Sequence, residues 1–216
     1  MFFRRKTPPT RSELIAQADK ARAKGKVKKA IAGYRKALEL EPGDAMVHGK
    51  LAPLLARTNA AGAALESFRA AAKAHLDKGF ADKAVAVYAQ AADTLPLEPT
   101  LWQQLAQLQV TRGRRADAVK ALLRGRVHFR RKAHRRHAIS LLKEALSLDG
   151  ELFAPKLDLA RLLAREGARA EAVVLLEPLA KTMKGRPLRQ VRWALARVAP
   201  GPGAYWRWMR AVLLGR

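Results

Sequence analysis

Cysteine is absent from this chain of 216 residues, and aromatic residues make up only 6% of it. Without cysteine, the chain cannot form disulfide bonds, thiolate metal sites or thiol nucleophiles. Charged residues interrupt every apolar run before it reaches the roughly 20 residues that a membrane-spanning helix requires. The N-terminal stretch lacks the apolar segment of a signal peptide. We therefore expect a cytoplasmic protein.

Acidic residues are also scarce, and the basic excess is unevenly distributed. The chain holds 43 Lys and Arg against 18 Asp and Glu, a net charge of +25. Residues 1–36 hold 12 basic and 2 acidic side chains, residues 112–136 hold 11 and 1, and residues 178–216 hold 9 and none. Such clustering is an electrostatic footprint for an acidic partner. A solvated surface in a chain of biased composition is the alternative interpretation.

The chain repeats itself without gaps through three copies, at a period of about 54 residues. Small and bulky residues coincide, including Ala30, Ala84 and Ala138; Tyr34, Tyr88 and Leu142; Ala37, Ala91 and Ala145; and Leu51, Leu105 and Leu159. A fixed internal period indicates a stacked array in which each unit contacts its neighbours. Apolar residues recur at helical spacing and alanine is abundant, so we expect an all-α fold.

The copies resemble the tetratricopeptide repeat family, whose units are helix–turn–helix pairs of about 34 residues. The family's pattern of a small residue, an aromatic residue four positions later and then proline is matched by Ala30, Tyr34 and Pro42, and by Ala84, Tyr88 and Pro96. The first-helix pattern is matched by Trp102, Leu105 and Ala106. The resemblance covers about residues 11–182 and implies a helical-hairpin solenoid of about 12 helices.

The spacing of the matched units departs from the family, because steps of about 34 residues alternate with steps of about 20 residues. The shorter step leaves no room for two separate helices, so we expect one long helix between Ala63 and Lys78 that serves two units. A similar helix is expected in the next copy, through Leu122 and Phe129. The true unit is then three helices in about 54 residues.

Three segments follow from this pattern. Residues 1–10 are predicted to be a basic, flexible terminus, residues 11–182 the repeat array, and residues 183–216 capping helices with an aromatic and basic tail. The alternative for the tail is an exposed aromatic and arginine surface that binds a partner.

The sequence offers no constellation for catalysis. His128, His134 and His137 lie close together, but the cations around them would repel a metal ion, and no acid or cysteine completes a ligand shell. A glycine-rich phosphate loop is not found either. We therefore predict a protein that is not an enzyme and has no catalytic residues, metal site, cofactor or small-molecule substrate.

Two groups of residues are candidate partner-binding surfaces. The first is a basic surface expected around the second long helix, formed by Arg124, Arg126, Arg130, Arg131, Arg135 and Arg136. The guanidinium group of arginine can form bidentate hydrogen bonds to a carboxylate or a phosphate. The second follows from the resemblance, because the family grips extended peptides on its concave face; here that face is assigned to Arg69, Lys73, Gln103, Gln104 and Gln107.

These surfaces predict a scaffold that binds an acidic protein or peptide. RNA is the first alternative, although Phe129 is the only aromatic residue within residues 112–136 on which a base could stack. An anionic membrane surface is the second alternative, because Phe2 and Phe3 lie beside basic residues at the N-terminus.

Overall fold

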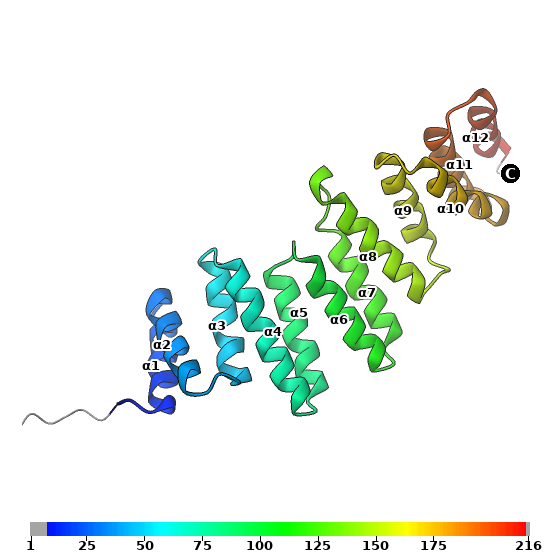
Figure 1. Ribbon diagram of the computed structural model, residues 1–216. Helices are drawn as coiled ribbons and strands as arrows, with labels where there is room; N and C mark the ends of the chain where they lie inside the picture. The colour runs from blue at the N-terminus through cyan, green and yellow to red at the C-terminus, as the bar shows by residue number, and fades with distance from the viewer. Residues whose placement is uncertain (1–7, 215–216) are drawn as a thin grey trace, which may run out of the picture. The chain divides into compact units, whose positions relative to one another are not determined.

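The computed structural model describes residues 8–214, and this part of the chain is helical throughout (Figure 1). It contains 12 α-helices and one short 3₁₀ helix, with no strand in the described range. The expected all-α fold of helical hairpins is confirmed. The predicted flexible N-terminus falls largely on residues 1–7, which lie outside the described residues.

Nine of the helices come in three sets, and the members of each set begin one repeat period apart. The sets are α2 (Val27–Leu40), α5 (Ala81–Thr94) and α8 (Arg135–Leu148); α3 (Ala45–Arg57), α6 (Pro99–Thr111) and α9 (Phe153–Arg165); and α4 (Ala61–Asp77), α7 (Arg115–Arg126) and α10 (Arg169–Thr182). The remaining helices in the described range are α1 (Arg11–Ala23), α11 (Gly185–Val198) and α12 (Pro202–Leu214). The three-helix repeat unit is therefore confirmed by the helix boundaries themselves.

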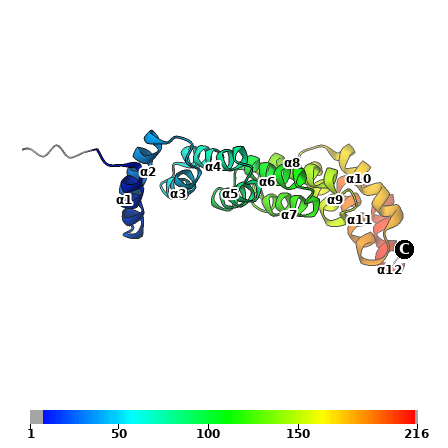
Figure 2. The ribbon, with the colours of Figure 1, turned by 90° about the horizontal axis from the view of Figure 1, so that it is seen from below.

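The chain forms two compact units, one ending at Leu108 and the other beginning at Gln109. In the first unit, α1 pairs with α2 and α3 pairs with α4, while α5 packs on α4 and α3. In the second unit, the pairs are α7 with α8, α9 with α10, and α11 with α12 (Figure 2). Helices α11 and α12 occupy the segment for which capping helices were expected, and their capping role stays a prediction.

Alanine allows the helices of a pair to approach closely, and larger side chains fill the remaining space. Ala30 and Tyr34 on α2 are both fully buried. On the same helix, a Cβ added at Gly33 would lie 2.9 Å from the Cβ of Ala18 on α1, so no larger side chain fits there without a shift. Interiors packed at this density are sensitive to added volume as well as to lost volume.

Replacement of Ala30 by leucine is expected to overpack the core around α2. The free energy of unfolding should fall by roughly 1–3 kcal/mol, because Ala30 is fully buried and the packed core has no space for the added isopropyl group. Urea denaturation followed by circular dichroism measures the change. Ala32 lies on the same helix and is exposed, so Ala32→Leu is the matched control. Equal losses in the two variants would contradict this account of the core.

The long helix expected between Ala63 and Lys78 is confirmed in the first unit, where α4 runs unbroken for 17 residues. Its expected counterpart in the next copy is wrong, because α7 ends at Arg126 after 12 residues. A short 3₁₀ helix at Lys132–His134 follows before α8 begins. The long helix therefore occurs in one copy and not in the other.

The sequence difference between α4 and α7 explains this result. Residues 70–72 are three alanines, whereas the equivalent residues of the next copy are Arg124, Gly125 and Arg126. Glycine in a helix costs about 1 kcal/mol relative to alanine, and like charges four residues apart, such as Arg126 and Arg130, add a further few tenths of a kcal/mol. The chain turns instead and buries Phe129, which is 2% exposed.

None of the helices in the described range combines the length and the apolar composition needed to cross a bilayer.

Candidate partner-binding groove

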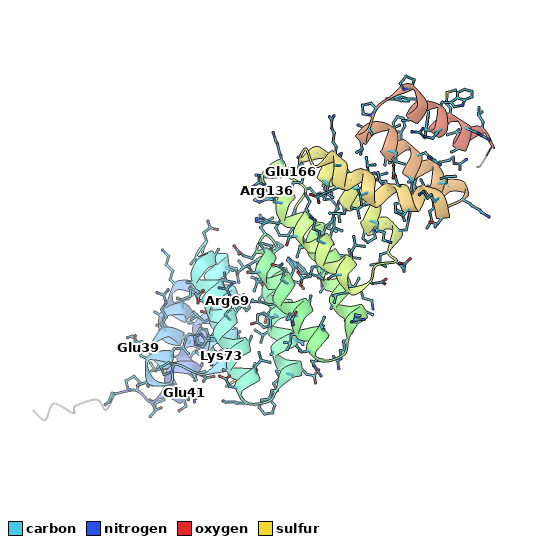
Figure 3. The ribbon with its side chains drawn as sticks, turned by 45° about the vertical axis from the view of Figure 1, so that its right-hand side comes forward. Glu39, Glu41, Arg69, Lys73, Arg136 and Glu166 are labelled. Atoms are coloured by element: carbon cyan, nitrogen blue, oxygen red, sulfur yellow. The ribbon has the colours of Figure 1, made fainter. Side chains whose placement is uncertain are left out.

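A groove of about 500 Å³ opens in the first unit where α4, α5 and α6 meet. Helix α4 contributes Arg69 and Lys73, which lie one turn apart on the same face (Figure 3). Helix α5 contributes Tyr88, and α6 contributes Gln104. The structure thus brings together three of the residues predicted for the concave face. Gln103 and Gln107 do not line the groove, and Tyr88 is a lining residue that the sequence analysis did not identify.

The two cations of the groove are held by exposed, local ion pairs. Arg69 Nη1 lies 3.3 Å from Glu66 Oε1, and Lys73 Nζ lies 2.8 Å from Asp77 Oδ2. Arg69 also donates a hydrogen bond of 3.4 Å from Nη2 to Thr100 Oγ1 on α6. Exposed pairs of this kind contribute only about 0–1 kcal/mol each. A carboxylate supplied by a ligand can therefore replace Glu66 or Asp77 at little cost.

The neutral side chains of the groove are positioned to make further hydrogen bonds. Burial raises the pKa of Tyr88, although the nearby charge of Arg69 acts in the opposite direction. The phenol therefore stays protonated near neutral pH and can donate a hydrogen bond. The Oε1 atom of Gln104 is buried and makes no hydrogen bond within the described residues. Unpaired buried polar atoms of this kind are uncommon in folded proteins, and this amide oxygen can accept a hydrogen bond from a donor such as a peptide N–H.

The same positions in the first copy form a closed polar cluster. Tyr34 donates a hydrogen bond of 2.6 Å to Asp19 Oδ1, and Lys50 Nζ donates one of 2.7 Å to Asp19 Oδ2. Burial acts to raise the pKa of Asp19, but the hydrogen bonds from Lys50 and Tyr34 hold it below its usual value. Burial and the hydrogen bond to Asp19 raise the pKa of Tyr34 to about 12. One carboxylate therefore satisfies a phenol and an ammonium group here.

In the second copy the carboxylate of this cluster is replaced by a cation. The equivalent residues one period later are Tyr88 for Tyr34, Lys73 for Asp19 and Gln104 for Lys50. The phenol is retained, but the acid that it would bind is replaced by a lysine. The groove of the second copy thus offers donors to a carboxylate that its own equivalent positions do not supply.

In the third copy the charged residue at this site again has a partner within the chain, although the residues differ. Leu142 takes the place of the tyrosine, and Asp158 takes the place of Lys50. Asp158 forms an ion pair with Arg126 of α7. In the second copy, by contrast, Arg69 and Lys73 form ion pairs with exposed acids one turn away on the same helix.

The arginine-rich segment between α7 and α8 does not form the continuous basic helix that we expected. The six arginines Arg124, Arg126, Arg130, Arg131, Arg135 and Arg136 are distributed over the end of α7, an irregular connection and the start of α8. Because α7 ends at Arg126, they cannot surround one helix. The expectation of a single basic helix is therefore wrong for this segment.

Several of these arginines are bound within the unit itself. The Nη1 atom of Arg135 donates hydrogen bonds to Glu166 Oε1 at 2.6 Å and to the carbonyl oxygen of Arg165 at 2.9 Å, and its side chain is only 15% exposed. Arg136 approaches the same glutamate at 3.7 Å, but its side chain is 90% exposed (Figure 3). Arg130 donates a hydrogen bond to the carbonyl oxygen of Val127 near the end of α7. Structural roles thus account for part of the predicted basic surface.

The neighbouring histidines take part in packing. The ring centroid of Phe129 lies 5.5 Å from that of His137 and 6.3 Å from that of His134, both in edge-on arrangements. Among the described residues, no group of three or more His, Cys, Asp or Glu side chains is placed to hold a metal ion.

A family model described as the bacterial transcriptional activator domain matches residues 11–146. The chain belongs to this family. The activator domain is a tetratricopeptide-like helical domain, so the family resemblance inferred from the repeats is confirmed. No curated protein sequence matches the chain.

Solved structures similar to this activator-domain chain include three bacterial proteins. A tetratricopeptide repeat protein from Parabacteroides merdae is 15% identical, with 95% of this chain and 93% of that chain covered and a TM-score of 0.35. TTC0263, a tetratricopeptide repeat protein of Thermus thermophilus, is 19% identical, with 95% and 100% covered and a TM-score of 0.28. PilF of Pseudomonas aeruginosa is 18% identical, with 92% and 96% covered and a TM-score of 0.28.

Proposed function

We propose that this chain is a non-enzymatic interaction module that binds an acidic segment of a partner protein in the groove of α4, α5 and α6. Helical repeat arrays bind proteins and peptides through surfaces assembled from successive helices. The family name associates such domains with bacterial transcriptional activation, so the partner that we propose is a protein of that process and the location is cytoplasmic.

One observation supports this proposal: Lys73 stands in the second copy at the position that Asp19 occupies in the first. In the first copy, the tyrosine and a cation bind an internal carboxylate at 2.6 and 2.7 Å. In the second copy, a carboxylate from the partner would meet the phenol of Tyr88 and the cations of Arg69 and Lys73. Hydrogen bonds to charged groups contribute about 1.5–3 kcal/mol each, which exceeds the value of the exposed pairs that they replace.

The exposed part of the basic segment has a separate role in the proposal. Arg131 and Arg136 lie at the surface of the second unit and add to its positive potential. Clustered surface charge accelerates encounter with a partner of opposite sign, and this effect weakens as salt is added. We therefore assign these arginines to long-range attraction and the groove to specific binding.

Two double substitutions test the proposal: one removes the cations of the groove, and the other removes the acids that pair with them. Arg69→Gln with Lys73→Gln is expected to weaken binding of a fluorescent glutamate-rich peptide by at least about tenfold, since two charge-assisted hydrogen bonds can no longer form. Glu66→Gln with Asp77→Asn should strengthen binding several-fold, because the two competing carboxylates are removed. Fluorescence anisotropy at fixed ionic strength measures both affinities.

The matched control is Arg35→Gln with Lys36→Gln, which removes the same two charges from exposed positions on α2. Its affinity for the peptide should change less than about twofold, the small effect expected for exposed charges outside the binding site. If the control weakens binding as much as the groove variant does, overall charge accounts for the binding and the groove assignment fails.

A further inference from the structure

The second unit contains a separate basic pocket, which is lined by α9, α10 and α11 and has a volume of about 380 Å³. Helix α9 contributes Arg161 and Arg165, α10 begins with Arg169, and α11 contributes Trp193 and Arg197. The rest of the lining is apolar, and no lining residue is acidic. The volume falls within the usual range for small-ligand sites, about 300–1,000 Å³.

The four arginines of this pocket have no counter-charge within the described part of the chain. All four are exposed, and none of them makes an ion pair with a described residue. The acids nearest to these arginines in the sequence already pair with other cations: Asp158 with Arg126, Glu166 with Arg135 and Arg136, and Glu171 with Lys143. The pocket therefore gathers four positive charges whose mutual repulsion an anionic ligand would relieve.

The residue types favour phosphate over carboxylate as the anionic group. A guanidinium group is planar and presents several donors that match the oxygens of a phosphate in pairs. A terminal phosphate carries up to two negative charges near neutral pH, whereas a carboxylate carries one. Four arginines around one pocket are thus better neutralised by a phosphate group, or by several phosphates in a chain.

Trp193 adds a flat apolar surface beside these cations. The residue is 37% exposed, and its ring lies against that of Trp208 on α12, with a centroid distance of 4.9 Å. The guanidinium of Arg197 lies over this ring, 5.8 Å from its centroid, so a base would pack on the part of the ring that Arg197 and Trp208 leave exposed. Aromatic side chains next to arginines are the typical surface on which proteins pack nucleic acid bases.

We propose that this pocket binds a nucleotide, with a phosphate group between the four arginines and the base against the exposed part of Trp193. The nucleotide is either free or part of a single-stranded nucleic acid, since both carry the same two chemical groups. This site lies within the second unit and is independent of the acidic-peptide groove in the first.

Binding of fluorescent ten-nucleotide oligouridylate, ATP and tripolyphosphate to the full chain tests the proposal. Arg161→Gln with Arg165→Gln is expected to lower the affinity for all three ligands by about a hundredfold or more, since two charge-assisted hydrogen bonds are lost. For the oligonucleotide, the slope of log affinity against log salt should fall by about 1.4, corresponding to about 0.7 for each phosphate that is no longer neutralised. The matched control is Arg186→Gln with Arg189→Gln, two exposed arginines of α11 outside the pocket lining.

Trp193→Leu separates base binding from phosphate binding. It should weaken oligouridylate and ATP by about tenfold, the usual size of a base–aromatic stacking interaction, and leave tripolyphosphate unchanged. A general loss of fold would weaken all three ligands together, so the ratio of affinities distinguishes the two causes. Much tighter binding of the oligonucleotide than of ATP assigns a nucleic acid strand, and similar binding assigns a free nucleotide.

Three results would overturn the proposal. The first is equal weakening by the pocket variant and the α11 control, which would show that overall charge controls binding. The second is tighter, pocket-dependent binding of a phosphoserine peptide than of either nucleotide ligand, which would assign a phosphoprotein partner. The third is absence of binding by oligouridylate and ATP at millimolar concentration in low salt.

Discussion

Lys73→Asp combined with Gln104→Lys is expected to abolish binding of acidic peptides while the first unit stays folded. The two substitutions reproduce in the second copy the arrangement of Tyr34, Asp19 and Lys50 in the first. The new aspartate would accept hydrogen bonds from Tyr88 and from the new lysine, and would occupy the donors that a ligand carboxylate needs. The groove would also gain a negative charge that repels the peptide.

The expected weakening is about a hundredfold or more, since charge reversal adds repulsion to the removal of a charge-assisted hydrogen bond. Anisotropy with the glutamate-rich peptide measures the affinity, and the urea midpoint shows that the unit remains folded. Gln17→Lys with Lys36→Asp makes the same charge changes at exposed positions of α1 and α2 and serves as the control. Undiminished binding by the groove variant would show that peptides bind elsewhere.

Phe68→Ala is expected to be the most destabilising single substitution among those considered. Phe68 is fully buried on α4, the long helix that packs against both α3 and α5. Truncation removes the apolar transfer energy of the ring and leaves a cavity, at a combined cost of about 3–5 kcal/mol. Because repeat units are stabilised chiefly by their immediate neighbours, the destabilisation should be concentrated in the helices that pack on α4.

Hydrogen exchange followed by mass spectrometry measures this effect on peptides that cover residues 45–94. Their protection should fall in Phe68→Ala, since local opening becomes easier as the packing is weakened. Phe80→Ala is the matched control, because Phe80 is 49% exposed and its ring lies beside Lys83 at 4.5 Å. Similar losses of protection in the two variants would mean that α4 is not the packing centre of the unit.

Some residues of the two proposed sites can be grouped from the sequence, whereas others are brought together only by the packing of helices. Arg69 and Lys73 could be paired from the sequence, because residues four apart lie on the same face of a helix. Tyr88 could not be added to them, since its position depends on how α5 packs against α4. The same holds for Arg197 and Trp193, which meet Arg161 and Arg165 only because α11 packs on α9.

The wrong prediction for the α7 segment has a local cause that is visible in the sequence. The period alone predicts a long helix there, but the replacement of three alanines by Arg124, Gly125 and Arg126 lowers helix propensity at the critical turn. The periodic pattern of apolar residues indicates which residues are equivalent. It does not indicate how far each helix extends.

By itself the sequence determined the helical class, the repeat period and the small-residue packing positions, because all three follow from local propensity and periodicity. Only the tertiary structure decided which charges are satisfied internally. The Tyr34–Asp19 and Arg126–Asp158 contacts join residues 15 and 32 positions apart. Contacts at such separations depend on the packing of whole helices, so the same repeat pattern yields a closed polar cluster in one copy and an open groove in the next.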